Sequence, residues 1–200
     1  VTTYRSMDLK ILKKINAEPI TSGSFPRFEN LVEGVCVAHG FRHPGLFIVR
    51  DSAPNMIMVG RNSYHGKLVA TTGLLERVTR VELEGLITHE LSRTKNRLTL
   101  LESTTAILIA RPMFFMPRIV KKIAKKIFDQ WVIAETDMSA VRMTRYPTGL
   151  ANALQSLYLD GREPTHNPKF CRHMWVNPPK GGLIPSGFST QERVVALEEL

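Results

Sequence analysis

The sequence has few cysteines and no long uninterrupted apolar run. Its two cysteines, Cys36 and Cys171, show no C-x-x-C spacing, so they do not form a disulfide scaffold, and a reducing compartment is the default expectation. No stretch reaches the roughly 18 to 20 uncharged apolar residues of a clean transmembrane helix. No Walker loop, dinucleotide-binding glycine motif or nucleophile elbow stands out, which leaves nucleotide binding and serine hydrolysis without a sequence signal.

Acidic residues are also in short supply. There are 18 Asp and Glu residues against 27 Lys and Arg, which gives a formal net charge of +9 at pH 7. Such a balance indicates an anionic partner, either a lipid surface or nucleic acid, or simply a solvated electropositive surface. With 200 residues and a hydrophobic fraction of 43%, the chain is long enough for one domain with a buried core.

The spacing of apolar residues predicts a mixture of helices and short strands. We expect strands at 46–49, 56–59 and 67–71, with a further short strand at 174–176. We expect helices at 28–38, 80–101, 132–159 (broken near Pro147) and 191–200, a short amphipathic helix within 1–20, and a helical turn at 73–77.

The most informative stretch lies in the predicted helix 80–101 and reads as H-E-x-x-H with a changed last position. His89 and a histidine at position 93 would lie on one helical face and could bind one zinc ion, with Glu90 as the general base for a zinc-bound water. Position 93 is Arg93 instead. A guanidinium is permanently charged and has no lone pair to offer a metal.

Several motifs together resemble the HtpX-like zinc metallopeptidases, a family of gluzincins that are integral to or attached to membranes. The similarity is specific in the central block, residues 54–97, which includes 69–76 and the stretch 81–97 with the altered motif, and it is weaker on either side. Pro54-Asn55-Met56 resembles the family's edge strand. Glu135-Thr136-Asp137 resembles its later E-F-x-A-D helix, and Asn177-Pro178 with Glu192-Arg193-Val194 resembles its closing segment.

The resemblance implies an α+β, gluzincin-like fold in which a small mixed sheet packs on the active-site helix and further helices. It implies one HtpX-like peptidase domain over residues 1–200. His89 matches the first zinc ligand and Glu90 matches the catalytic base, whereas the second ligand falls on Arg93. The third ligand, four residues before Asp137, falls on Ile133 and is lost. Asp137 should face the site from one helical turn away, and Glu135 should face outward.

The gained cation at Arg93 coincides with the loss of two ligands. Glu90 and Asp137 would be costly to bury as unpaired anions. We therefore predict that Arg93 pairs with both carboxylates and replaces the ion as the link between the two helices. His89 and Asp137 are then vestigial metal residues, and Glu90 is a vestigial general base. The alternative is that Arg93 points to solvent and the pocket has collapsed.

Residues 104–129 form a basic, apolar insertion in which we expect a helix. Arg118, Lys121, Lys122, Lys125 and Lys126 punctuate its apolar positions, and Phe114 and Phe115 precede them. A basic amphipathic helix of this kind is typical of contact with an anionic membrane surface or a partner. Packing on the domain with a solvated lysine face is the alternative.

The sequence therefore favours a catalytically degenerate, metallopeptidase-like protein. It would act as a binding or scaffold subunit in a larger complex or at a membrane surface, without a cofactor, inside the cell and peripheral to or anchored at the membrane. Its edge-strand cleft could hold an extended peptide by strand addition. One alternative is a zinc endopeptidase with rearranged ligands, using His89, Asp137 and a loop histidine, either His166 or His173. The other is a basic adaptor for nucleic acid, the less favoured partner.

Overall fold

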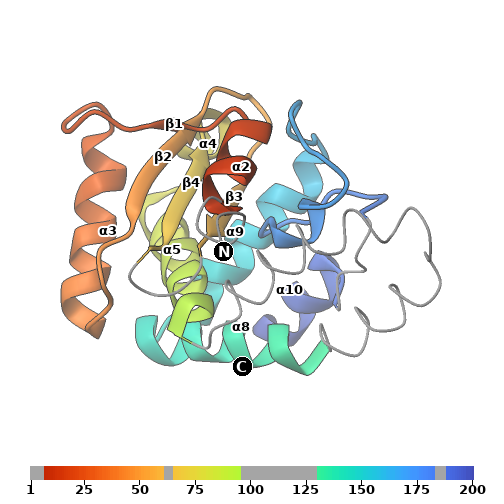
Figure 1. Ribbon diagram of the computed structural model, residues 1–200. Coiled ribbons are helices and arrows are strands. Elements are labelled where there is room, and N and C mark those ends of the chain that lie inside the picture. The colour runs from red at the N-terminus through yellow and green to blue at the C-terminus, as the bar shows by residue number, and fades with distance from the viewer. Residues whose placement is uncertain (1–6, 61–64, 96–129, 183–187) are drawn as a thin grey trace.

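A computed structural model describes residues 7–60, 65–95, 130–182 and 188–200. Its elements, shown in Figure 1, follow one another as α2 (Met7–Lys14), β1 (Glu18–Pro19), α3 (Pro26–His39), β2 (Gly45–Val49), β3 (Met56–Val59), β4 (Lys67–Thr71), α4 (Thr72–Arg77), α5 (Arg80–Lys95), α8 (Gln130–Thr144), α9 (Pro147–Asp160), the 3-10 turn η2 (Arg172–Met174) and α10 (Thr190–Glu198). The basic insertion at 104–129 lies outside the described residues, and the single-domain prediction stays a prediction.

The sheet is small and mixed, with the strand order β1-β2-β4-β3. β2 and β4 are parallel, and β1 and β3 pair antiparallel with their neighbours. β3 is therefore an outer strand, and all four of its residues are buried. Something other than a neighbouring strand of the sheet must cover its free side.

Side chains alternate between the two faces of the sheet, as the period of a strand requires. Met56, Met58 and Leu68 belong to a large core with α3, α5, α9 and α10. Ile57 and Val69 belong to a second core on the opposite face. There they pack with α2 and with the segment that contains Met174 and Trp175. The sheet thus separates two apolar clusters, and α5 lies against the larger one.

Two prolines begin helices at the position where a missing backbone N–H costs least. Pro26 starts α3, and Pro147 starts α9 after Arg145, whose φ of 55° breaks the chain away from α8. The predicted break in helix 132–159 is therefore confirmed, with α8 and α9 as separate helices. In Figure 1, α8 runs across the end of α5, α9 lies beside α5, and α10 lies beside α9.

The predicted α+β class with a small mixed sheet is confirmed, and the strands 56–59 and 67–71 lie where the sequence placed them. The predicted strand at 174–176 is instead the turn η2 followed by a single antiparallel bridge between Ile57 and Trp175. β1 was not predicted, because a two-residue strand of Glu18 and Pro19 carries no alternation to detect.

Candidate active site

The middle of α5 carries His89, Glu90 and Arg93, and all three side chains are buried. Together with Asp137 of α8 they form the cluster that we call the centre. Their side chains lie where α5 meets α8 on one side and the residues after η2 on another. Buried hydroxyls on the same helix satisfy themselves locally, since Thr88 donates to the carbonyl of Glu84 and Ser92 donates to that of Thr88. The helix can therefore be enclosed by protein without leaving these groups unpaired.

His89 is held by Asp137 of α8. The Nδ1 atom of His89 lies 2.9 Å from Oδ1 of Asp137, and the other ring nitrogen, Nε2, lies 3.4 Å from Nη2 of Arg193. The prediction that Asp137 faces the site is confirmed, and Glu135 is exposed, as its position on the helix required. This buried contact joins α5 to α8.

Asp137 also receives a guanidinium, and it is that of Arg193 in α10. Arg193 Nε lies 2.8 Å from Oδ2 and Nη2 lies 2.7 Å from Oδ1, which is the bidentate geometry of an arginine–carboxylate pair. Burial raises the pKa of Asp137, but the charge and hydrogen bonds of Arg193, together with His89, outweigh it and hold the pKa well below its ordinary value. Asp137 is therefore ionised in the folded protein.

Arg193 also closes the face of His89 that a metal would use. Its Nη2 lies 3.4 Å from Nε2 of His89, and its Nη1 donates to the carbonyl of Val176 at 2.8 Å. The sequence places Arg193 only in the segment that resembles the family's closing segment, and it does not predict Arg193 as a site residue. The one signal that could have found it is a cation in a segment that the resemblance places near the site.

Arg93 lies on the other side of the centre and pairs with Glu90. Its Nη1 is 2.7 Å from Oε1 of Glu90 and donates to the carbonyl of Met174 at 3.0 Å. The predicted pair between Arg93 and Glu90 is therefore present. The predicted role of Arg93 toward Asp137 is wrong, because Arg193 is the arginine that binds Asp137.

Comparison with known proteins now identifies the family. A model described as Peptidase family M48 matches residues 23–159, which is more than half of the chain. The chain belongs to peptidase family M48. A relative named Protease HtpX homolog from Tropheryma whipplei is 30% identical over 92% of this chain and 76% of its own length. Another of the same name, from Dictyoglomus thermophilum, is 29% identical over 90% of this chain and 70% of its own length.

The donor set of this M48 chain does not fit the zinc of a metallopeptidase. Catalytic zinc takes three protein ligands and a water, and the positions of two ligands hold Arg93 and the half-buried hydrocarbon of Ile133. His89 keeps one usable nitrogen, which faces a guanidinium. In the described ranges, no three His, Cys, Asp or Glu side chains come close enough to share a metal ion.

The loop histidines do not complete the set. His166 is exposed and sits near Asp51, so it does not reach the centre. His173 is buried and lines a different cavity. Cys171 is buried too, and burial raises the pKa of its thiol to about 12. The rearranged zinc site proposed from the sequence therefore lacks support from the described part of the M48 domain.

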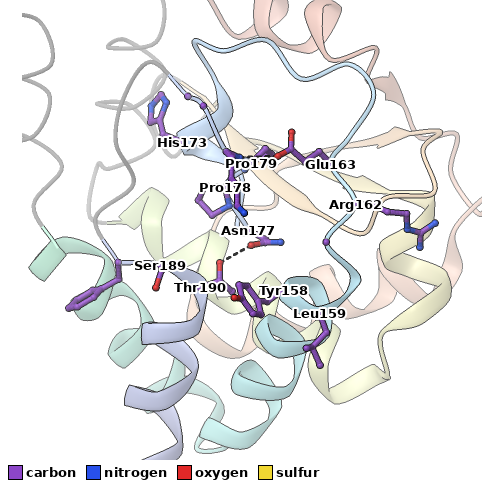
Figure 2. A pocket seen from close by; sticks show the side chains of 15 residues that line it. Tyr158, Leu159, Arg162, Glu163, His173, Asn177, Pro178, Pro179, Ser189 and Thr190 are labelled. Atoms are coloured by element: carbon purple, nitrogen blue, oxygen red, sulfur yellow. Dashed lines mark hydrogen bonds between the residues drawn. The ribbon is translucent and has the colours of Figure 1, made fainter. Parts of the chain in front are cut away.

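The cavity that His173 lines has a volume of about 630 Å³ and opens between the end of α9 and the start of α10 (Figure 2). Tyr158, Leu159 and Arg162 lie on one side of it, and Pro178 and Pro179 lie on another. Thr190 hydrogen-bonds to Asn177 across its floor at 2.7 Å. Neither His89 nor Glu90 lines it, so the cavity is separate from the cluster that these two residues form on α5.

The residues predicted to contact a membrane or partner, namely Phe114, Phe115, Arg118, Lys121, Lys122, Lys125 and Lys126, all lie outside the described residues. In the described ranges, no helix has the length and apolar character to span a bilayer.

Proposed function

We propose that this M48 chain is a pseudoprotease, a protein that keeps the peptidase fold but binds or scaffolds other proteins and does not hydrolyse them. One observation carries the proposal: at the centre, Arg93 and Arg193 supply positive charge to Glu90 and Asp137, where a peptidase would use a metal. In the described part of the site, the arginines and the carboxylates form two hydrogen-bonded pairs.

The chemistry of hydrolysis argues in the same direction. A zinc ion in a peptidase lowers the pKa of its bound water from about 15.7 to about 7, so that a glutamate can take the proton. Glu90 lies in the right helix for that role, but its Oε1 is engaged by Arg93. The oxygen that would take a proton from water is therefore already a hydrogen-bond acceptor for Arg93.

Binding would take place in a larger complex or at an anionic membrane surface. The support for this part is the formal net charge of +9 and the run of lysines and Arg118 between residues 118 and 126. Both features fit attraction to acidic lipid headgroups. A protein partner that carries an acidic face would meet the same surface.

The test is metal content together with cleavage of a generic substrate. We expect the purified full chain to hold far less than one zinc per molecule and to leave labelled casein uncut, as does Glu90→Gln. A double variant, Arg93→His with Ile133→Glu, restores the ligand types and should increase zinc uptake. Stoichiometric zinc in the unaltered protein, with casein cleavage that disappears in Glu90→Gln, would overturn the proposal and return the chain to the zinc endopeptidases.

A further inference from the structure

The free side of β3 is the natural place for an extended peptide to bind, because an outer strand offers unpaired backbone groups to an added strand. Part of this side is already occupied by the chain itself. Trp175 pairs antiparallel with Ile57, and the N–H of Val176 donates to the carbonyl of Met56 at 2.9 Å. The expected cleft beside β3 is therefore filled at Met56 and Ile57.

Asn55 extends this pairing by one residue, just before β3 begins. Its side-chain amide donates from Nδ2 to the carbonyl of Asn177 at 2.8 Å, and its Oδ1 accepts from the N–H of Asn177 at 3.2 Å. A single side chain thus satisfies both backbone groups of one residue, as a neighbouring strand would. Both bonds go to backbone atoms of residue 177 and do not involve the side chain at that position.

The two arginines, Arg93 and Arg193, also bind backbone carbonyls of the same segment. Arg93 donates to the carbonyl of Met174, and Arg193 donates to the carbonyl of Val176. Each arginine is fixed in turn by a buried carboxylate, Glu90 or Asp137. The replacement of a zinc ligand by Arg93 has therefore added a donor that binds backbone in the groove.

Side chains of the segment contribute to both cores, with Met174 and Trp175 in the smaller one and Val176 in the larger one. Trp175 packs with Ile57 and Val69 in one core, and Val176 packs in the other core, beside Met56. Both are 1% exposed. The segment is thus as deeply enclosed as a central strand, although only one bridge joins it to the sheet.

We propose that Met174–Asn177 is a built-in peptide that occupies the strand-binding groove of this protein, and that an outside ligand must displace it. The fitting ligand is an extended peptide with an aromatic side chain at the Trp175 position and an aliphatic one at the next. The inference deepens the proposed function, because a groove that binds without cleaving needs a means to control access.

The cavity of Figure 2 gives a partner a way to reach this segment from outside. Asn177, Pro178 and Pro179 line it directly after the built-in peptide. A molecule seated there would contact the end of the segment without entering the centre at His89.

Amide hydrogen exchange tests the closed state in the unaltered protein. We expect the N–H groups of Val176 and Asn177 to exchange about 100-fold more slowly than those of exposed loops, in the range of Val69 and Ala70 of β4. Exchange of Val176 and Asn177 at loop rates, with β4 still protected, would overturn the proposal.

A binding experiment tests whether the groove accepts a peptide once the segment is loosened. The probe is a fluorescein-labelled peptide with the sequence of residues 172–180, RHMWVNPPK, and the readout is anisotropy. Val176→Pro removes the N–H that bonds to Met56 and should raise affinity for the probe about tenfold or more over the unaltered protein. If this variant shows no cooperative thermal unfolding, Trp175→Ala serves as the loosened form.

Asn55→Ala is the matched control, since it loosens the segment by damaging the groove itself. It should speed exchange at Asn177 yet gain little affinity for the probe. A folded, loosened variant that binds the probe no better than a scrambled peptide would overturn the proposal. Because none of these readouts involves metal or cleavage, their failure is distinct from failure of the proposed function.

Discussion

Arg193 is the residue on which the centre of this M48 chain depends most. It is 5% exposed, binds both oxygens of Asp137, and reaches the carbonyl of Val176. When one partner of such a buried pair is removed, the other is left as an uncompensated charge. The cost is then larger than the net contribution of the pair itself.

Arg193→Ala should therefore lower the free energy of unfolding by about 3–5 kcal/mol, measured by urea denaturation. Arg142→Ala, an exposed arginine on α8, is the matched control and should change it by no more than about 0.5 kcal/mol. Equal effects of the two substitutions would show that Asp137 does not depend on its guanidinium.

Asp137 gives this pair a defined pH dependence. Its pKa is lowered in the folded state, so its contribution is complete above the ordinary pKa of about 4 and is lost as the pH falls toward the folded value. Asp137→Asn should be less stable than the unaltered protein at pH 7, and the difference should shrink between about pH 4 and pH 2. Denaturation at several pH values measures this, and a constant difference down to pH 2 would contradict it.

At this scale the sequence predicted the contacts that lie within one helix or across its facing neighbour. Arg93 and Glu90 are three residues apart on α5, and Asp137 was placed toward the site by the family resemblance together with helical geometry. Arg193 is 56 residues from Asp137, and helical periodicity carries no information about which distant arginine will arrive. The prediction that Arg93 pairs with Asp137 was wrong for this reason.

The helix α10 delivers Arg193, and its start is fixed by a complete capping box. Ser189 accepts from the N–H of Glu192, and the Glu192 side chain accepts from the N–H of Ser189. This reciprocal pair sets where the helix begins and hence which face carries Arg193. The cap therefore stabilises both an element and the position of the guanidinium.

Ser189→Ala should cost about 1 kcal/mol of unfolding free energy, because it leaves an N–H at the start of α10 without its acceptor. Ser189→Asp keeps a side-chain acceptor and should restore most of the loss. Thermal unfolding of the two variants compares them directly. A loss of similar size in both would mean that the cap contributes little.

Elements with a long periodic pattern were predictable from the sequence, and irregular ones were not. β3 and β4 were found as runs of apolar, β-favouring residues, and α5 was found from its helical spacing. The segment after η2 behaves as a strand partner for reasons that no local pattern encodes. Its backbone is held by Asn55, Arg93 and Arg193, each from another part of the chain.

The whole molecule is strongly basic, and the excess charge is the property that any partner meets first. A formal charge of +9 attracts acidic surfaces over about 8 Å at physiological salt. A lysine close to an acidic bilayer contributes about 1 kcal/mol to binding. The basic insertion should therefore dominate membrane affinity if it meets the bilayer.

The full chain should bind vesicles of phosphatidylcholine with phosphatidylserine and leave pure phosphatidylcholine vesicles unbound. Changing Lys121, Lys122 and Lys125 to Gln should weaken sedimentation with the acidic vesicles about 100-fold. The control changes Lys10, Lys13 and Lys14, three exposed lysines of α2, and removes the same total charge. Equal losses would point to a general charge effect and not to the insertion, and tighter binding to duplex DNA at equal salt would favour the nucleic-acid alternative.

Under the proposed function, Arg93 and Arg193 make a metal unnecessary, which also affects how the protein matures. A metalloprotein must acquire its ion after synthesis, can take up the wrong one, and loses stability when a chelator competes for it. The two guanidinium groups, by contrast, are part of the polypeptide and are present as soon as it is synthesised. The melting temperature should therefore be the same with and without EDTA, and cells starved of zinc should accumulate as much folded protein as well-supplied ones.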